Sequence, residues 1–156
     1  MTKKITTLIL IHQKDKLLLG LKKRGFGVGR WNGFGGKLND GETIQQAAKR
    51  ETNEEANIEL GDLEKLGIME FYWKNKADFC IEVNVFKSRI FSGIPTESEE
   101  MKPQWFDIKE IPYSQMWQDD KYWLPLFLDG KKFKGKFIFD DNDNILEKDL
   151  VIVEKI

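Results

Sequence analysis

Three carboxylates on one face of a predicted helix constrain this chain more than any other feature of its sequence. Glu51, Glu54 and Glu55 lie three and four positions apart, and residues at those spacings share one side of an α-helix. The stripe continues back through Ala47–Ala48 and forward to Ile58, so acids interrupt an apolar face. Like charges so placed repel by roughly 0.2–0.5 kcal/mol per pair, and by more where the helix packs on the protein.

A divalent cation would turn that repulsion into binding. Carboxylate oxygens with few His or Cys neighbours suit Mg²⁺, Ca²⁺ or Mn²⁺, and the chain has one histidine, His12, and one cysteine, Cys80. A solvated acidic face on an amphipathic helix explains the three glutamates alone equally well. The residues around them favour the metal.

The stretch from Gly36 to Ile58 resembles the Nudix box. That signature is Gly, five residues, Glu, seven residues, Arg-Glu, an aliphatic, any residue, Glu-Glu, any residue, Gly and an aliphatic. Thr52 replaces the first aliphatic, and Asn57 replaces the second Gly but suits a left-handed helix C-cap. The matching positions are Gly36, Glu42, Arg50, Glu51, Glu54, Glu55 and Ile58.

The resemblance implies a hydrolase of nucleoside diphosphate derivatives that uses Mg²⁺, with Mn²⁺ as an alternative, and an α/β/α sandwich fold. In the family, the carbonyl of Gly36 and the glutamates matching Glu51, Glu54 and Glu55 hold the metal. Glu100, outside the box, is the candidate for an added ligand or base, and Arg50 is grouped with the catalytic residues. A metal would neutralise the phosphate chain while one glutamate accepts a proton from water. Which glutamate is the base stays open.

Segments outside the box extend the resemblance over nearly the whole chain. KKRGFGVGRWNGFGGK before it, and EMKPQWF and MWQDDKYW after it, are similar to the eukaryotic MutT-like branch of the family, which hydrolyses oxidised purine nucleoside triphosphates. There, groups matching Asn32, Asp119 and Asp120 hold the damaged purine, with its ring against Trp117. The substrate-binding set implied is Thr7, Lys22, Phe26, Asn32, Phe34, Gly35, Gly36, Lys37, Phe71, Met101, Trp117, Gln118, Asp119, Asp120 and Trp123, with Phe139 close to the pocket.

The adjacent carboxyls of Asp119 and Asp120 have a physical rationale at a base edge. Two such groups seldom ionise together, so they can share one proton. A protonated Asp donates a hydrogen bond and an ionised one accepts, so moving the proton could match both 8-oxoguanine and 2-hydroxyadenine. Without the resemblance, a helix N-cap beside a solvated Asp is favoured here, and core packing explains Trp123 and Met101.

A basic loop, Lys22–Arg30, has Gly at every second position from Gly25. Glycine lets backbone N–H groups approach a ligand. The loop fits neither the dinucleotide-binding fingerprint nor the phosphate-binding P-loop. Solvated lysines and contacts to a phosphate or base both remain open.

The hydrophobic pattern predicts a single α/β domain over residues 1–156, with a mixed sheet between helices. Thr43 and Gln46 form a predicted capping box for the glutamate-bearing helix. A second helix is predicted from Asp119 or Asp120 to Leu128. The predicted strands are Ile5–Ile11, Lys16–Leu21, Glu64–Trp73, Phe79–Ser88, Gln104–Asp107, Lys132–Phe139 and Ile145–Val153.

Charge argues against polymeric or membrane partners. The 25 basic and 26 acidic residues give a net charge of −1, so no bulk attraction to nucleic acid or membranes is expected. No apolar run is long enough to span a bilayer, and one cysteine fits a reducing compartment. We expect a monomer that binds a small nucleotide in the cytoplasm; family resemblance adds the nucleus and mitochondrial matrix.

The expected reaction converts 8-oxo-dGTP, 2-hydroxy-dATP and related purines such as O6-methyl-dGTP to monophosphate and pyrophosphate. It would cleanse the nucleotide pool and prevent misincorporation into DNA. One alternative is a Nudix hydrolase for another substrate, such as a dinucleoside polyphosphate, ADP-ribose or a methylated purine triphosphate. The other is a non-catalytic nucleotide-binding module, although such modules often lose box glutamates that are all present here.

Overall fold

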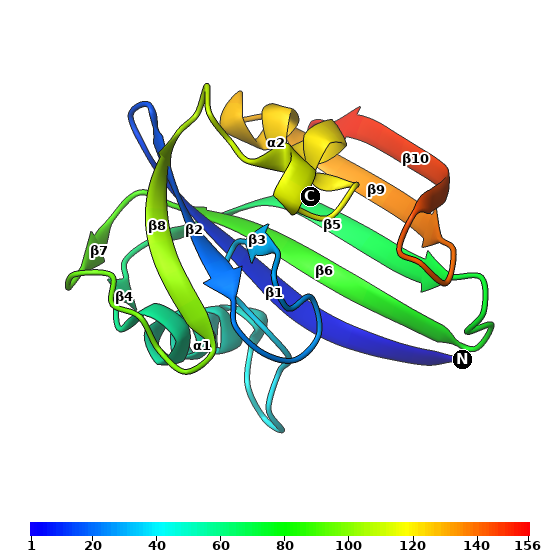
Figure 1. Cartoon of the computed structure of the whole chain (residues 1–156), viewed down its shortest axis with the longest axis horizontal. Coiled ribbons are helices and arrows are strands. Elements are labelled where there is room, and N and C mark those ends of the chain that lie inside the picture. Colours follow the sequence, from blue (N-terminus) through cyan, green and yellow to red (C-terminus); the bar gives the residue numbers. More distant parts are fainter.

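The computed structural model describes residues 1–156 and consists of a large sheet, a small sheet and two α-helices (Figure 1). All seven predicted strands and both predicted helices are present. The elements are β1 Thr2–Gln13, β2 Lys16–Lys22, β3 Trp31–Asn32, α1 Ile44–Ala56, β4 Glu59–Leu60, β5 Leu63–Trp73, β6 Phe79–Ser88, β7 Phe91–Ser92, β8 Met101–Asp107, a 3₁₀ turn Tyr113–Gln115, α2 Asp120–Leu128, β9 Lys132–Phe139 and β10 Ile145–Val153.

The large sheet is mixed, as predicted. Its strands follow the order β10-β9-β5-β6-β1-β2-β3, and β8 pairs with β2 on a separate branch. The β1–β6 and β5–β9 pairs are parallel and the other neighbours are antiparallel. The short strands β4 and β7 form the second sheet.

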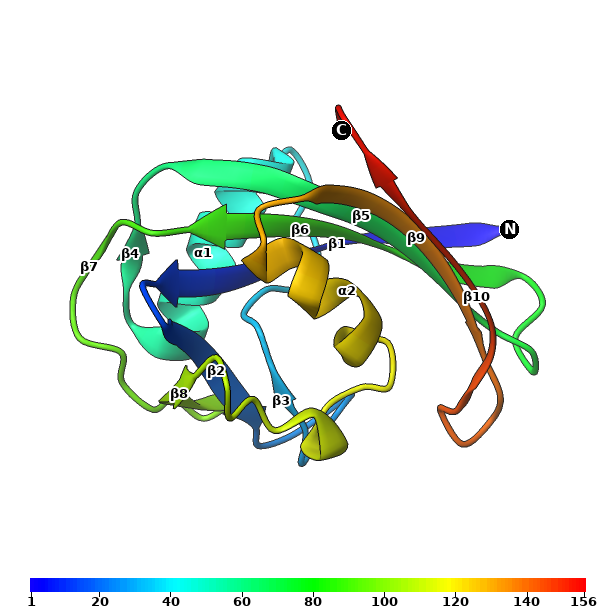
Figure 2. The same ribbon diagram turned by 90° about the horizontal axis from the view of Figure 1, so that it is seen from above.

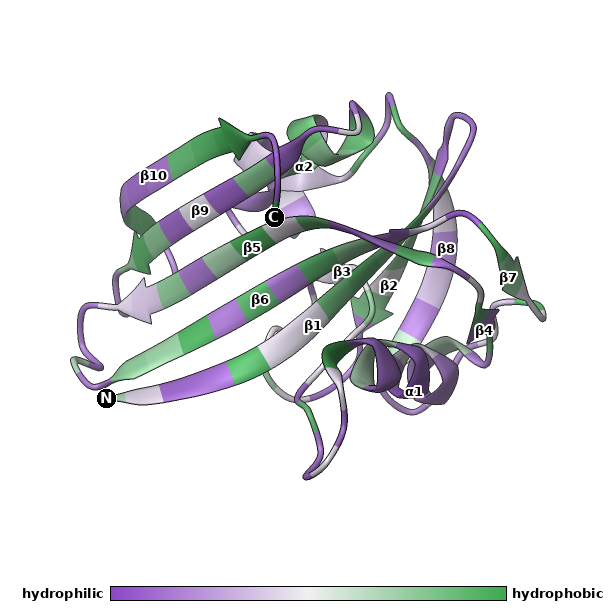
Figure 3. Ribbon diagram, turned by 180° about the vertical axis from the view of Figure 1, so that it is seen from behind, coloured by the Kyte–Doolittle hydropathy of each residue, from purple (hydrophilic) through white to green (hydrophobic).

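Alternation along the central strands builds a core on each face of the large sheet. Ile9 and Leu18 belong to the core that contains Ala48 of α1, whereas Leu10 and Leu17 belong to the core beside α2. The helices therefore cover opposite faces, and the hydropathy colouring shows α1 turning its polar side outward (Figure 3). This arrangement confirms the predicted α/β/α sandwich.

The large sheet splits between β1 and β2. These strands pair only from Ile11↔Leu18 to Gln13↔Lys16, and β2 then diverges to pair with β8 (Figure 2). The segment between β3 and α1 runs along the edge of β1 that β2 has left, through bridges at Thr6↔Lys37 and Ile9↔Phe34. Residues on both faces of the sheet can therefore meet in the split.

Both ends of α1 form as predicted. The Thr43 hydroxyl accepts from the Gln46 N–H at 3.1 Å, and the Gln46 side chain accepts from the Thr43 N–H at 2.9 Å. Asn57 adopts the left-handed conformation at φ 58°. Thr52 is buried and donates to the Ala48 carbonyl at 2.8 Å, so its hydroxyl is satisfied inside the helix. These contacts fix where α1 begins and ends, and hence where its glutamates lie.

The capping prediction for α2 is wrong. Asp119 precedes the helix, but its backbone is already right-handed and its side chain makes no capping hydrogen bond. Asp120 lies inside the first turn, and both side chains are buried rather than solvated. The two-residue strands β3, β4 and β7 were not predicted, because two residues are too few to show alternation; β4 and β7 also pair with each other across more than 30 positions of the chain.

Neither helix is long and apolar enough to cross a membrane.

Candidate active site

A cavity of about 300 Å³ opens beside the split in the sheet. Its lining joins side chains of β1, β5, β6 and β9 to the loop before β3, the segment after β3 and the start of α2. Glu55 of α1 also reaches it. The cavity therefore has an acidic end at α1 and an aromatic end near α2.

Two glycines allow the acidic end to form. A Cβ at position 36 would lie 2.8 Å from the Glu51 carboxylate carbon, so only glycine lets that carboxylate lie against the backbone. Gly35, at φ 148°, lies so close to β1 that a Cβ would meet the Thr7 carbonyl oxygen at 2.0 Å. The Gly35 N–H donates to Glu55 at 2.8 Å. Gly36, the first residue of the box, and its neighbour Gly35 therefore lie directly against two box glutamates.

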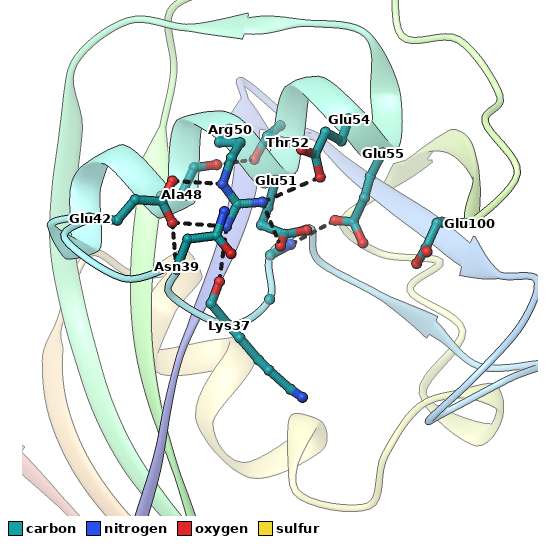
Figure 4. A network of polar contacts seen from close by, with 12 residues as sticks. Lys37, Asn39, Glu42, Ala48, Arg50, Glu51, Thr52, Glu54, Glu55 and Glu100 are labelled. Atoms are coloured by element: carbon teal, nitrogen blue, oxygen red, sulfur yellow. Dashed lines mark hydrogen bonds and ion pairs between the residues drawn. The ribbon is translucent and has the colours of Figure 1, made fainter.

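Arg50 organises the glutamates of α1 (Figure 4). It donates two hydrogen bonds to Glu42, at 2.6 and 2.9 Å, and others to Glu51 at 3.0 Å and Glu54 at 3.3 Å. A further bond at 3.0 Å reaches the Lys37 carbonyl. From the sequence we group Arg50 with the catalytic residues, but it does not line the cavity. In the structure it contacts these acids and the Lys37 carbonyl.

The glutamates of α1 differ in their surroundings. Burial raises the pKa of Glu55 to about 8, although the Gly35 N–H and the charge of Lys22 oppose the shift. Burial also raises the pKa of Glu51, against the hydrogen bond from Arg50. Glu54 is exposed, with 59% of its side chain accessible. Hydrogen bonding to Lys22 lowers the pKa of Glu100. The predicted acidic stripe therefore runs from solvent into the protein.

The donor set fits a hard divalent cation. The carboxylates of Glu51, Glu54, Glu55 and Glu100 and the carbonyl of Gly36 supply only oxygen, which Mg²⁺ and Mn²⁺ prefer. Burial raises the pKa of Glu51, Arg50 opposes the shift, and the charges of Glu54 and Glu100 add smaller increases, so these acids influence one another electrostatically. As they stand, however, no three acidic side chains converge closely enough to enclose an ion.

Salt bridges explain that lack of convergence. Lys22 lies 3.1 Å from Glu100, and Arg24 lies 3.2 Å from the same carboxylate. Arg50 holds Glu51 and Glu54 in the same way. A metal would have to compete with these cations for the carboxylates.

The aromatic end contains the buried acid pair. The Trp123 indole N–H donates to Asp119 Oδ2 at 2.7 Å. Asp119 Oδ1 and Asp120 Oδ2 are buried without a partner, and both residues line the cavity. Burial raises the pKa of both carboxyls, and the charge of Asp119 raises the pKa of Asp120 further. The hydrogen bond from the Trp123 N–H opposes the rise in the pKa of Asp119.

Aromatic rings surround this pair. Trp117 lies 5.1 Å from Phe26 and 6.0 Å from Phe139, measured between ring centroids. Trp73 stacks on Phe139 at 5.4 Å. All four line the cavity. A flat aromatic ligand could pack against these rings, and Asp119 and Asp120 could form hydrogen bonds with its edge.

Lysines flank the acidic end. Lys4 and Lys37 line the cavity, and burial together with the nearby Lys37 lowers the pKa of Lys4 to about 8. Lys22 also lines it, whereas Lys23 and Arg24 form ion pairs with Glu97, Glu99 and Glu100 outside it. The basic loop thus turns its first lysine inward and its next two basic side chains toward the 97–100 segment.

Most of the predicted substrate-binding residues meet in this cavity. Those that line it are Thr7, Lys22, Phe26, Asn32, Gly35, Gly36, Lys37, Phe71, Met101, Trp117, Asp119 and Asp120, together with Phe139. Phe34, Gln118 and Trp123 do not. Phe34 and Trp123 are buried in the two cores, and Gln118 binds Asn144 and the Ile145 N–H instead.

Other lining residues were not predicted. They are Lys4, Thr6, Leu8, Gly27, Gly33, Trp73, Ile81 and Val83. The strand residues among them could have been found from alternation, because Lys4, Thr6 and Leu8 share one face of β1. Their position beside Ile81 and Val83 depends on the parallel register of β1 with β6, which the sequence does not reveal.

Comparisons with known proteins agree with this geometry. Residues 2–127 match the NUDIX domain family. The chain is 48% identical to an "Oxidized purine nucleoside triphosphate hydrolase" of Danio rerio over 99% of both chains. It is also 48% identical to the protein of that name in Mus musculus, over 96% of this chain and 95% of that one. The crystal structure of a mutator MutT protein from Bacillus halodurans superposes with a TM-score of 0.84, at 26% identity, covering 94% of this chain and 97% of that one.

Proposed function

The chain belongs to the Nudix hydrolase family, and on that premise we propose that it hydrolyses oxidised purine nucleoside triphosphates to monophosphate and pyrophosphate. 8-Oxo-dGTP and 2-hydroxy-dATP are the proposed main substrates, with O6-methyl-dGTP as a related one. The names of the zebrafish and mouse relatives support this substrate class. The reaction would remove damaged purines before a polymerase incorporates them into DNA.

The buried acid pair is the observation that carries the proposal. Leaving buried polar atoms unpaired is costly, yet Asp119 Oδ1 and Asp120 Oδ2 both lack a partner. A purine edge would supply the missing hydrogen bonds. An ionised Asp119 beside a protonated Asp120 offers an acceptor next to a donor. Because the shared proton can move between the carboxyls, the pair can present either order to two different damaged bases.

The aromatic rings and Asn32 complete the proposed base site. Trp117 supplies a stacking surface worth about 1–3 kcal/mol. Asn32 lines the cavity and can donate and accept, although its Oδ1 already accepts from the Gly33 N–H at 2.8 Å. Selectivity would follow from hydrogen-bonding groups that a mismatched purine leaves unpaired, because such defects are far costlier than lost apolar contact.

The acidic end is the proposed site of phosphate cleavage. Members of the family generally use divalent metals, and we propose Mg²⁺, held by Gly36, Glu51, Glu54, Glu55 and Glu100. When bound, the metal supplies charge neutralisation and activation of water. Arg50 keeps Glu51 and Glu54 in place, and Lys22 and Lys37 would contact the phosphates. Glu55 is the other acid that reaches the cavity at this end, and we propose it as a metal ligand or as the general base.

A substrate panel with pyrophosphate detection tests the proposal. We expect kcat/KM for 8-oxo-dGTP and 2-hydroxy-dATP to exceed the value for dGTP, with pyrophosphate as the co-product. Equal values for 8-oxo-dGTP and dGTP would contradict the proposed base site. Release of phosphate or ribose phosphate from another substrate would point to a different Nudix activity. Calorimetric binding without hydrolysis in Mg²⁺ would indicate a non-catalytic module.

We also propose that the protein acts as a monomer in a reducing compartment such as the cytoplasm. Cys80, its only cysteine, is buried. Light scattering of the purified protein tests the monomer.

A further inference from the structure

The turn between β9 and β10 contacts Trp73 directly and Trp117 through Arg30. Asp143, in this turn, accepts a hydrogen bond from the Trp73 indole N–H at 3.0 Å through Oδ1. Its Oδ2 lies 3.6 Å from Arg30 Nη2. The Arg30 guanidinium lies over the Trp117 ring, 4.1 Å from the ring centroid. One carboxylate therefore joins Trp73 to Trp117.

Phe26 closes these contacts into a ring. Its centroid lies 5.1 Å from Trp117 and 6.0 Å from Trp73, the latter edge to face. We call Phe26, Trp117, Arg30, Asp143 and Trp73 the clamp ring. Its members come from the basic loop, the segment before α2, the end of β5 and the β9–β10 turn. Trp73, Phe26 and Trp117 line the cavity, so the aromatic members of the ring form part of the wall of the proposed base site.

The turn itself is held firmly. Asp140 accepts from the N–H groups of Asn142 and Asn144 at 2.8 and 2.9 Å. Gln118, next to Trp117, donates to the Asn144 side chain at 2.6 Å and accepts from the Ile145 N–H at 2.8 Å. The carboxylate of Asp143 thus starts from a fixed backbone position.

An ordinary surface ion pair is the plain explanation for Arg30 and Asp143, since each side chain is about one-third exposed. Such pairs contribute little. Two observations distinguish this one. Asp143 Oδ1 is anchored by Trp73, which is only 7% exposed, and the guanidinium that Oδ2 contacts is packed on an indole face. One carboxylate oxygen of Asp143 is therefore held by Trp73, and the other helps to hold Arg30 against the Trp117 ring.

We propose that Asp143 is a positioning residue for purine recognition, acting through Arg30 on Trp117 and directly on Trp73. It sets the spacing between the two indoles that face the base. This inference rests on the proposed function, and it adds a specificity determinant that lies far from the cleavage end.

Kinetics of Asp143→Asn provide the main test. Asparagine keeps an oxygen for the Trp73 N–H but loses the charge that holds Arg30. Because a cation–π contact contributes modestly, we expect KM for 8-oxo-dGTP to rise about 3- to 10-fold. The value of kcat should stay within about twofold, because the acidic end is untouched. Asp141→Asn, an exposed neighbour in the same turn, is the matched control and should leave KM unchanged.

A double-mutant cycle shows whether Asp143 acts through Arg30. Arg30→Met should raise KM by a similar factor, and the double variant should resemble Arg30→Met alone, because the two residues share one route to Trp117. Arg89→Met, an exposed arginine elsewhere, is the control. Additive increases would overturn the inference. A lower Tm with unchanged KM would also overturn it, since that result indicates a purely structural role.

NMR keeps this test separate from the proposed function. In the wild type, the Trp117 ring current should shift the Arg30 side-chain protons upfield, and Asp143→Asn should reduce that shift. The Trp73 indole N–H should stay protected from exchange in Asp143→Asn and lose protection in Asp143→Ala. If the wild type hydrolyses no oxidised purine triphosphate, the proposed function fails, and these spectra still test the ring. Unshifted Arg30 protons in the wild type would overturn the ring itself.

Discussion

Glu55 differs from the other glutamates of α1, because it is buried and still reaches the cavity. Glu55→Gln keeps the size and one hydrogen-bonding oxygen but removes the charge and the exchangeable proton. We expect kcat to fall by at least about 10³-fold, since ligand and base functions are lost together. Binding of 8-oxo-dGMP, measured by calorimetry, should change little.

Glu59→Gln is a suitable control, because Glu59 is exposed just beyond the helix. It should retain wild-type rates. Normal turnover in Glu55→Gln would remove Glu55 from the reaction and call the whole metal assignment into question.

Asp119 is expected to govern the choice of base rather than the cleavage step. Asp119→Asn retains an acceptor for the Trp123 N–H but loses the charge. Hydrogen bonds to charged groups contribute about 1.5–3 kcal/mol, so kcat/KM for 8-oxo-dGTP should fall about 10- to 100-fold. The value for dGTP should fall less. The control is Asp129→Asn, at the other end of α2, which should preserve the ratio of kcat/KM for 8-oxo-dGTP to kcat/KM for dGTP. If Asp119→Asn also preserved that ratio, Asp119 would be excluded from base selection.

Asp120 should make the folded state less stable as pH rises. Its pKa is raised well above the ordinary value by burial and by Asp119, whereas the unfolded chain titrates near about 3.9. Above that pH the unfolded state loses the proton first, so the free energy of unfolding decreases until pH passes the folded pKa. Urea unfolding from pH 4 upward should show this slope in the wild type and a flatter one in Asp120→Asn. Equal slopes would mean that Asp120 is not the buried proton carrier.

At the scale of the element, the C-terminal end of α1 depends on one left-handed residue. Asn57 has φ 58°, a conformation that costs most L-residues about 1–2 kcal/mol but suits Asn and Gly. Asn57→Ala should therefore lower the free energy of unfolding by about 1 kcal/mol. Asn57→Gly should stay within about 0.5 kcal/mol of the wild type. Denaturant titrations measure both, and equal destabilisation by Ala and Gly would show that side-chain contacts, not backbone conformation, matter there.

Local signals were sufficient to predict most elements. The capping box at Thr43 and the cap at Asn57 each involve residues only a few positions apart, so both could be predicted from the sequence. Alternation located β9 to the residue, and the turn that follows it located β10. By contrast, the local sequence around Asp119 is that of a helix cap; the family resemblance placed it at the purine, and the structure shows it buried with a hydrogen bond from Trp123.

At the scale of the whole molecule, the acidic end of the site was predictable and the shape of the cavity was not. The box spacing alone brings Glu51 to Gly36 and Arg50 to Glu42, because these contacts depend on one helix and the loop before it. The position of Trp73 opposite Trp117 depends instead on the parallel pairing of β5 with β9 and on the β9–β10 turn. Strand register over such separations leaves no local signature.

Metal binding should be visible as global stabilisation. A cation that binds only the folded state stabilises it by about 2.7 kcal/mol at 100 times its Kd, which corresponds to a Tm increase of several degrees in a protein of this size. MgCl₂ should therefore raise Tm, and EDTA should abolish both the increase and hydrolysis. Glu51→Gln should show a smaller increase than Glu59→Gln. An unchanged Tm in millimolar MgCl₂ would contradict the proposed ligand set.

The split between β1 and β2 would make the site sensitive to the length of the phosphate chain. Because α1 and α2 cover opposite faces of the sheet, a nucleotide gripped by its base near α2 can reach the glutamates of α1 only if its phosphate tail crosses that gap. The thickness of the sheet would then set the length of phosphate chain that can reach from the base site to the glutamates. A monophosphate left after cleavage would lack the phosphates that interact with the acidic end, and this loss would favour its release.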